Sequence, residues 1–430
     1  MLQLALLLTG TGFVRRNAPW LGFIGVFWGG IGISMFIDGL QGERYFPLHI
    51  FGSLLLAESL ITLMLAPSGV GAQKAVLYFK GGIFCFVALL ILSGRESSNL
   101  LLAVVFGFAF LITGLFVMAA AWVVRYQHWP TACLGGFCRF LFGIYLIIPY
   151  PTHHQGIVSQ FIGMIMILSG IHCLRLALRA RRIREGDSIF HLLAPGGLLP
   201  PADQTRTEQI PEPPQDSSPL IVHVWTPEGS ADNTPIPRPV FNRYIAAVDT
   251  NGVISTGHAA LEMHPDLYIS LYPAEDIDRS PSEFFNTLKA IQDNNVAGDF
   301  QKNYVSEAAA WCESDRKVVF HDFNPAALRR YWASYRQVEI YNLTWRNCSS
   351  SVAYALEAAL DGVFAHRGGW LSFLRLFLIP ELWIASQLRK RAMTMAWTPG
   401  LALDYARALH AIVHPVQLSW LRRRRHDEAS

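Results

Sequence analysis

The sequence predicts a multidomain protein in which an all-α polytopic membrane bundle is followed by an α+β domain. Hydrophobic residues make up 52% of the 430-residue chain and charged residues only 16%, a composition too apolar for an ordinary soluble protein. Six long apolar runs lie within the first 178 residues, whereas short alternating segments and helix-start signals fill the region after residue 240. The length is sufficient for two or three domains.

Each apolar run is long enough to cross a hydrocarbon core of ~30 Å, which needs about 20 helical residues. The runs cover residues 19–39, 46–66, 75–94, 99–124, 131–149 and 154–178. Before them, Met1–Val14 lacks a leading basic segment and is followed by Arg15 and Arg16. This opening segment therefore predicts an interfacial or leading helix and not a cleaved signal.

The six runs contain an internal repeat. Phe51-Gly52, Phe106-Gly107 and Phe161 with Gly163 recur at intervals of about 55 residues, which predicts three copies of a helical hairpin. Small residues at such positions let helices approach closely in lipid. The pattern resembles the HdeD family of six-span bacterial membrane proteins, and this resemblance implies a role in acid stress.

Basic residues set the expected orientation of the bundle. Arg15 and Arg16 precede the first run, and a cluster of arginines from Arg175 to Arg184 closes the last. With an even number of spans, the positive-inside rule places both termini in the cytoplasm. We therefore expect a multi-pass protein of the bacterial inner membrane with a cytoplasmic soluble domain.

Three charged residues, Glu58, Lys80 and Arg139, fall at or near bilayer depth, where charge is costly. They could form a proton or ion path. The simpler interpretation is an internal ion pair or side chains that extend to the interface, and we favour it.

The chain is predicted to divide into a membrane domain over 1–184, a proline-rich linker over 185–239, an α+β domain over 240–368 and an amphipathic segment over 369–430. Ile221–Trp225 could form a short strand within the linker. The last segment is apolar but interrupted by charge and proline, so we expect it to lie on the bilayer or the bundle. Ordinary packing on the soluble domain is the alternative.

One cysteine and one histidine in the α+β domain carry the functional signal. The stretch from Arg346 to Val352 predicts a turn that leads Cys348 into a helix start, where backbone N–H groups and the helix dipole favour the thiolate. His258 lies on a predicted strand and could accept the thiol proton. A buried structural cysteine and a hydrogen-bonded core histidine form the simpler alternative.

Residues 240–365 resemble the permuted NlpC-like branch of the papain-like fold, which includes lecithin–retinol acyltransferase-type enzymes. His258, in the run that continues to Pro273, and the Asn347-Cys348 pair match that pattern residue by residue. The third position, usually another histidine in the acyltransferase group, is Ser270 here. Glu262 shares a strand face with His258, but lies ~13 Å along the strand, too far to touch the imidazole.

The remaining chemistry-bearing residues give weaker signals. Cys312 is predicted to be core on a helix, and His264, His321 and Asp322 to be surface or capping residues. The six cysteines show no metal-ligand or disulfide spacing, so no metal or cofactor is expected. A net charge of +3 gives no footprint for nucleic acid.

The sequence thus predicts a membrane-anchored cysteine hydrolase or acyltransferase that cleaves an amide or ester through an acyl-thioester. Its expected catalytic residues are Cys348, His258 and Ser270, and its expected partners are the bilayer and an unidentified amide or ester substrate. The alternative is a non-enzymatic stress-response protein with an inactive papain-like domain, which the serine at position 270 favours. The oligomeric state is left open.

Overall fold

The structure is a computed structural model, and the chain folds into two compact units. The membrane unit contains Val14–Trp122 and His128–Arg184, and the sheet unit contains Met1–Phe13, Val123–Gln127 and Glu185–Ser430. The structure describes residues 1–42, 46–68, 72–94, 96–149, 153–183, 188–196, 198–199, 218–226, 247–248, 254–255, 257–275, 277, 284–367 and 369–415.

Six helices are long and apolar enough to cross a membrane, and they coincide with the six predicted runs. They are α2 (Thr11–Leu40), α3 (Leu48–Leu65), α4 (Ala72–Ser93), α5 (Glu96–Val124), α6 (Trp129–Ile147) and α7 (Ile157–Ala180), with a short 3-10 turn, η1 (Ala66–Ser68), after α3. Many of their large apolar side chains are exposed, as a lipid solvent requires. The prediction of a helical membrane protein is therefore confirmed at this level.

Glycines bring these helices together in pairs. A Cβ placed on Gly32 of α2 would lie 2.8 Å from the carbonyl oxygen of Gly163 in α7, and one on Gly114 of α5 would lie 2.7 Å from that of Gly136 in α6. In α4, a Cβ on Gly81 would lie 2.6 Å from the Leu63 side chain of α3 and 3.3 Å from its backbone nitrogen. Only a residue without a side chain allows backbones to approach this closely.

These glycine contacts join neighbouring copies of the predicted repeat and not the two helices of one copy. The predicted hairpins are α2 with α3, α4 with α5, and α6 with α7. The glycine contacts instead join the second helix of one hairpin to the first helix of the next, and α7 returns to α2. The three copies are thus linked in a closed cycle.

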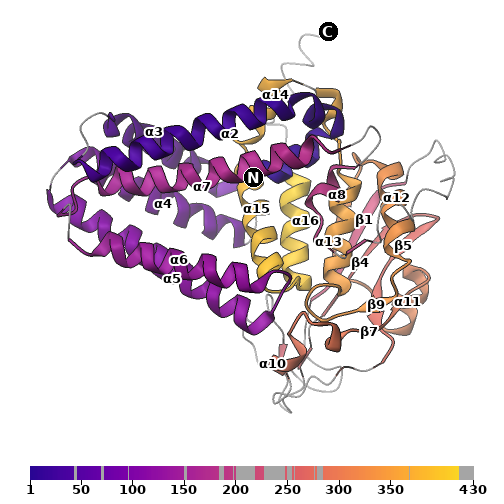
Figure 1. The fold of residues 1–430 in the computed structure, drawn as a ribbon. Helices are drawn as coiled ribbons and strands as arrows, with labels where there is room; N and C mark the ends of the chain where they lie inside the picture. The colour runs from indigo at the N-terminus through magenta and orange to yellow at the C-terminus, as the bar shows by residue number, and fades with distance from the viewer. Residues whose placement is uncertain are drawn as a thin grey trace, which may run out of the picture. The chain divides into compact units, whose positions relative to one another are not determined.

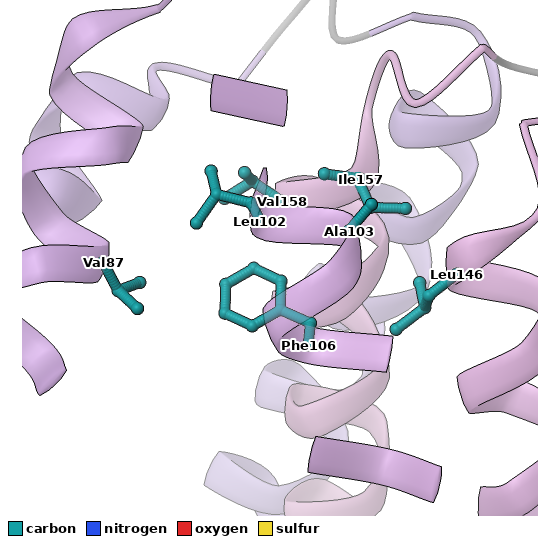
Figure 2. Packing of buried hydrophobic residues seen from close by; sticks show 7 residues of the cluster. All are labelled: Val87, Leu102, Ala103, Phe106, Leu146, Ile157 and Val158. Carbon is teal, nitrogen blue, oxygen red and sulfur yellow. The ribbon is translucent and has the colours of Figure 1, made fainter. Parts of the chain in front are cut away.

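Apolar side chains from four helices fill one part of the interior of the membrane unit. The cluster contains Val87, Leu102, Ala103, Phe106, Leu146, Ile157 and Val158 (Figure 2). The Phe106 ring stacks on Phe161, with 3.7 Å between centroids, so two members of the phenylalanine repeat meet. Lys80 Nζ lies 2.5 Å from Glu58 Oε1, which is the internal ion pair that the simpler interpretation expected.

The sheet unit combines short strands with helices, which confirms the α+β expectation at the coarse level (Figure 1). Its helices are α1 (Leu2–Thr9), α8 (Ile189–Leu193), α10 (Phe284–Thr287), η2 (Gln292–Asn294), α11 (Tyr304–Ala310), α12 (Pro325–Tyr335), α13 (Cys348–Ala359), η3 (Ala365–Arg367), α14 (Trp370–Leu376), α15 (Pro380–Thr394) and α16 (Pro399–Val413). Its strands are β1 (Leu220–Trp225), β2 (Ala247–Val248), β3 (Ile254–Ser255), β4 (His258–Met263), β5 (Leu267–Ile269), β6 (Leu271–Pro273), β7 (Val296–Phe300), β8 (Arg316–Phe320) and β9 (Ile340–Tyr341). The papain-like relationship stays a prediction.

Two antiparallel sheets meet at Ser270, the residue between β5 and β6. The first has the order β5-β4-β1-β8, and the second has the order β6-β7-β9. Leu261 of β4 pairs with Ile269 on one side of the break, and Leu271 pairs with Phe300 of β7 on the other. The chain therefore changes sheets at a predicted site residue.

Helix α13 lies at the centre of the sheet unit, and every one of its residues is buried. It packs against β4, α12 and α16, and Figure 1 shows α13 and α16 side by side. Arg389 of α15 donates from Nε to Oε1 of Glu357 in α13 at 2.7 Å and from a second nitrogen to Oε2 at 3.1 Å. Because both oxygens of the buried Glu357 carboxylate are paired, the charge is tolerated in the core.

The opening helix α1 belongs to the sheet unit, which corrects the expectation of an interfacial helix inside a 1–184 domain. Its residues Leu4 through Leu8 are at most 1% exposed. The N–H groups of Gly362 and Phe364 donate to the carbonyls of Leu7 and Leu8 at 2.8 Å each. Apolar content alone cannot distinguish burial in protein from burial in lipid, which explains the error.

Part of the predicted linker is also integral to the fold. The segment 220–225 forms β1, the strand that pairs with both β4 and β8, so it is central to the sheet instead of lying in a tether. Residues 185–187, 197, 200–217 and 227–239 of the linker lie outside the described residues.

The predicted 369–430 segment is not separate either. Helix α16 is capped by the Thr398 side chain and buries most of its length against α15, α13 and the sheet. Helices α14 and α15 together are apolar enough for a seventh span, but a bend of 67° separates them. Leu371, Leu374 and Leu378 remain exposed, so only the α14 end keeps the amphipathic surface expected from the sequence.

Candidate active site

Cys348 is the first residue of α13, as the helix-start signal predicted. The Asn347 side chain accepts a hydrogen bond from the N–H of Ser350 at 2.8 Å, and the Ser350 hydroxyl accepts one from the N–H of Asn347 at 2.8 Å. This reciprocal capping box fixes the first turn. The thiol therefore lies beside the unpaired N–H groups and positive dipole end of the helix.

The turn before the cysteine is held by a buried arginine. Arg346 is fully buried, and its guanidinium donates to four backbone carbonyls at 2.6–3.0 Å: those of Leu198, Tyr335, Val338 and Ile340. It also stacks over the Tyr335 ring at 3.7 Å. These contacts fix the backbone that presents Cys348.

His258 begins β4, directly after a glycine that has a φ of 69°. That conformation favours glycine, and it lets the chain turn sharply into the strand. The imidazole stacks on the Tyr272 ring with 4.1 Å between centroids, and the Trp225 ring lies 5.4 Å away. The ring is 3% exposed, so its orientation is set by packing as well as by hydrogen bonds.

The structure brings together all three predicted site residues. Nε2 of His258 lies 2.8 Å from the Ser270 hydroxyl, and the imidazole and the Cys348 thiol line the same cavity. Because Nε2 already faces Ser270, Nδ1 is the nitrogen available to the sulfur. Cys348 and His258 each shift the pKa of the other, as two groups that exchange a proton would.

A fourth residue, Glu307 of α11, completes the cluster, and sequence reasoning missed it. Its Oε1 lies 3.2 Å from Nε2 of His258. The Tyr268 hydroxyl donates to its Oε2 at 2.6 Å, and the Tyr272 hydroxyl donates to its Oε1 at 2.8 Å. A buried carboxylate with three hydrogen-bond partners can hold an imidazole in one orientation and stabilise its charged form.

The pKa values of the cluster move in the directions that a thiolate–imidazolium pair requires. Burial lowers the pKa of His258, but the charge and hydrogen bonds of Cys348 and Glu307 outweigh it and raise that pKa to about 9. Burial raises the pKa of Cys348, yet His258, the Ser349 hydroxyl and the backbone N–H of Ala259 together lower it below the usual thiol value.

Glu307 remains charged for similar reasons. Burial raises the pKa of its carboxyl, but hydrogen bonds from His258 and the two tyrosines lower it to about 2. The carboxylate in turn raises the pKa of Tyr268 and Tyr272, together with their burial, so both hydroxyls stay protonated as donors.

A cavity of about 390 Å³ opens onto this cluster. Cys348, His258 and Glu307 line it together with Gln301 and Tyr272. The volume lies within the range of small-molecule sites, roughly 300–1,000 Å³. The thiol and the imidazole are therefore reached from the same space.

The other weighed residues lie apart from this cluster. Glu262 pairs with His223 at 3.2 Å, so it does not orient His258. Asp322 pairs with His414 at 3.4 Å, and His321 is exposed. Cys312 is exposed after the end of α11, which corrects its predicted place in a helical core. Within the described ranges, no His/Cys/Asp/Glu group has metal-binding geometry.

No family model, curated protein or solved structure matches this chain. Its class therefore follows from its own fold and site. It is a membrane protein by its six apolar helices, and its α+β unit contains a buried Cys–His–Glu cluster at a cavity.

Proposed function

We propose that this protein is a membrane-anchored cysteine hydrolase or acyltransferase that cleaves an amide or ester through an acyl-thioester on Cys348. The observation that carries the proposal is that Cys348, His258 and the Glu307 partner of His258 line one cavity. A structural cysteine needs neither a charged imidazole nor access to a cavity.

The residues define a complete cycle. His258 takes the thiol proton, and the thiolate forms a C–S bond to the substrate carbonyl carbon. The bond from that carbon to the leaving nitrogen or oxygen breaks, and the leaving group takes the proton from His258. Water or an acceptor alcohol then attacks the thioester, gives its proton to His258 and releases the acyl product, after which the proton returns to sulfur.

Two groups stabilise charge during these steps. The backbone N–H of Cys348, at the helix start, is the proposed donor to the oxyanion, an interaction worth roughly 3–4 kcal/mol in comparable sites. Glu307 stabilises the imidazolium, and Ser270 donates or accepts at Nε2 beside it. Ser270 stands at the position where the resembled acyltransferases usually carry a second histidine, and Glu307 contacts the same imidazole nitrogen.

The path of the chain supports the placement of the whole sheet unit on one side of the bilayer. Six spans alternate in direction, so Phe13, residues 123–127 and residue 185 all emerge on the same side. These are the points where the chain enters the sheet unit. Arg15, Arg16 and the cluster ending at Arg184 lie at that side, so we propose that it is the cytoplasmic face of a bacterial inner membrane.

A non-enzymatic role, such as an HdeD-like stress-response protein with an inactive soluble unit, is the second candidate. The serine at position 270 and the glycine-linked helical repeat favour it. The presence of Glu307 on the same imidazole nitrogen weakens the argument from Ser270, because the imidazolium has an anionic partner without a second histidine.

Ester turnover by the full-length protein in detergent separates the two candidates. We expect p-nitrophenyl acetate to acetylate Cys348, seen by mass spectrometry, and Cys348→Ala to lose turnover by ~10³-fold or more. Cys312→Ala is the matched control and should retain turnover. A folded wild-type protein that is never acylated would support the non-enzymatic role.

A further inference from the structure

Cys348 borders a second cavity, separate from the one that contains His258. This cavity measures about 120 Å³, and mostly apolar side chains line it. They include Leu288, Leu343, Met395, Trp397 and Leu401.

The two cavities differ in the groups that they offer to a substrate. Cys348 and Tyr341 line both of them. Among the described residues, His258, Glu307 and Gln301 line only the larger cavity. Cys348 therefore lies between the larger, more polar cavity, which His258 lines, and the smaller apolar cavity, which His258 does not line.

The proposed reaction assigns the leaving group of the substrate to the larger cavity and the acyl substituent to the smaller one. The leaving group must receive its proton from His258, so it must depart on the side of the imidazole. The attacking water or alcohol must give a proton to the same imidazole, so it enters from that side too. The acyl substituent exchanges no proton, and the opposite side of Cys348 is open to it.

We infer that the smaller cavity binds the acyl substituent of the substrate and restricts it to a compact apolar group. The inference rests on the proposed function, because it assumes that Cys348 is acylated. A comparable apolar cavity of roughly 150 Å³ holds one benzene molecule. The cavity thus accommodates a branched aliphatic side chain, a small ring or an acyl chain of a few carbons, whereas a long fatty chain has to leave it.

Two alanines, one in each cavity, allow a matched test. Ala396 lines the apolar cavity and Ala310 lines the polar one. Acylation rates of Cys348 in the full-length protein are measured by mass spectrometry with p-nitrophenyl acetate, butyrate, hexanoate and dodecanoate. In the wild type we expect kcat/KM to be highest for butyrate or hexanoate and at least ~10-fold lower for dodecanoate, since each methylene in a fitted pocket matters.

Ala396→Phe should shift the optimum to acetate and reduce the butyrate rate by ~10-fold or more. Ala310→Phe should leave the ratio of rates along the series unchanged, and Met395→Ala should extend the optimum to longer chains. A flat series, or an acyl preference that responds to Ala310→Phe and not to Ala396→Phe, would overturn the inference while Cys348 is still acylated. No acylation by any ester would instead overturn the proposed function and the inference with it.

Discussion

In the membrane unit, glycines let helix backbones meet, whereas in the sheet unit, buried charged side chains around α13 are paired. Gly32 and Gly163 bring α2 and α7 into backbone contact. Around α13, by contrast, Arg346, Glu357 and Glu307 are buried with their hydrogen-bonding groups engaged. The lipid-facing unit depends on close approach, and the other unit depends on buried polar networks that also build the site.

The largest effect should come from filling a glycine contact in the membrane unit. Gly32→Leu places a side chain where even a Cβ would lie 2.8 Å from backbone atoms of α7, so the two helices cannot pack. We expect loss of monodisperse protein in fluorescence-detected size-exclusion chromatography. Gly30→Leu, two residues away in open space, is the matched control, and equal behaviour of the two variants would contradict the glycine-contact account.

The second-largest effect should come from a substitution that creates a cavity at α1 of the sheet unit. Leu7 is fully buried, so Leu7→Ala should reduce the free energy of unfolding by about 2–5 kcal/mol. Hydrogen exchange of the α13 amides in the full-length protein measures this loss. Leu374→Ala, at a side chain that is 55% exposed, should change it by less than about 0.5 kcal/mol. If Leu7→Ala had no effect on α13, α1 would not be part of this unit.

A smaller effect is expected from the polar network at the site. Glu307→Gln removes the anionic partner of His258, and a hydrogen bond to a charged group contributes about 1.5–3 kcal/mol. Ester turnover should therefore fall by roughly 10- to 150-fold, whereas Ser270→Ala should cost less. Because Glu307 raises the pKa of His258, the alkaline limit of activity should also move below pH 9. A limit that stays in place would show that Glu307 does not act on the imidazole.

The two units also differ in how far the sequence predicts them. Spans can be predicted because length and apolar content alone define them. The spacing of the repeat does not predict which copies touch, and the stacking of Phe106 on Phe161 is visible only in the structure. The expectation of an interfacial helix is wrong for the opening segment, because Met1–Phe13 is as apolar as a span but lies in the sheet unit. Its burial depends on contacts with residues more than 350 positions away, such as Gly362, and no local pattern encodes them.

The candidate site is likewise predictable only where local sequence patterns determine the structure. Cys348 and His258 stand in local contexts that predict a helix start and a strand, and the fold brings them together. Glu307 lies in a short helix with three alanines after it and resembles a surface residue in the sequence. Its burial arises because Tyr268 and Tyr272, on other strands, donate to it. The burial of such an acid can be recognised only from the folded structure and not from the local sequence.

The thiolate–imidazolium pair is the central claim, and the pH dependence of Cys348 alkylation tests it most directly. Iodoacetamide reacts with the thiolate, and the adduct on Cys348 is quantified by peptide mass spectrometry from pH 4 to pH 10. The wild type should react at pH values well below the ordinary thiol pKa of 9.0, with a second change near pH 9 as His258 loses its proton. In His258→Ala the reaction should require pH values near or above that ordinary pKa. A single ionisation at or above the ordinary thiol pKa in the wild type, unchanged in His258→Ala, would contradict the account.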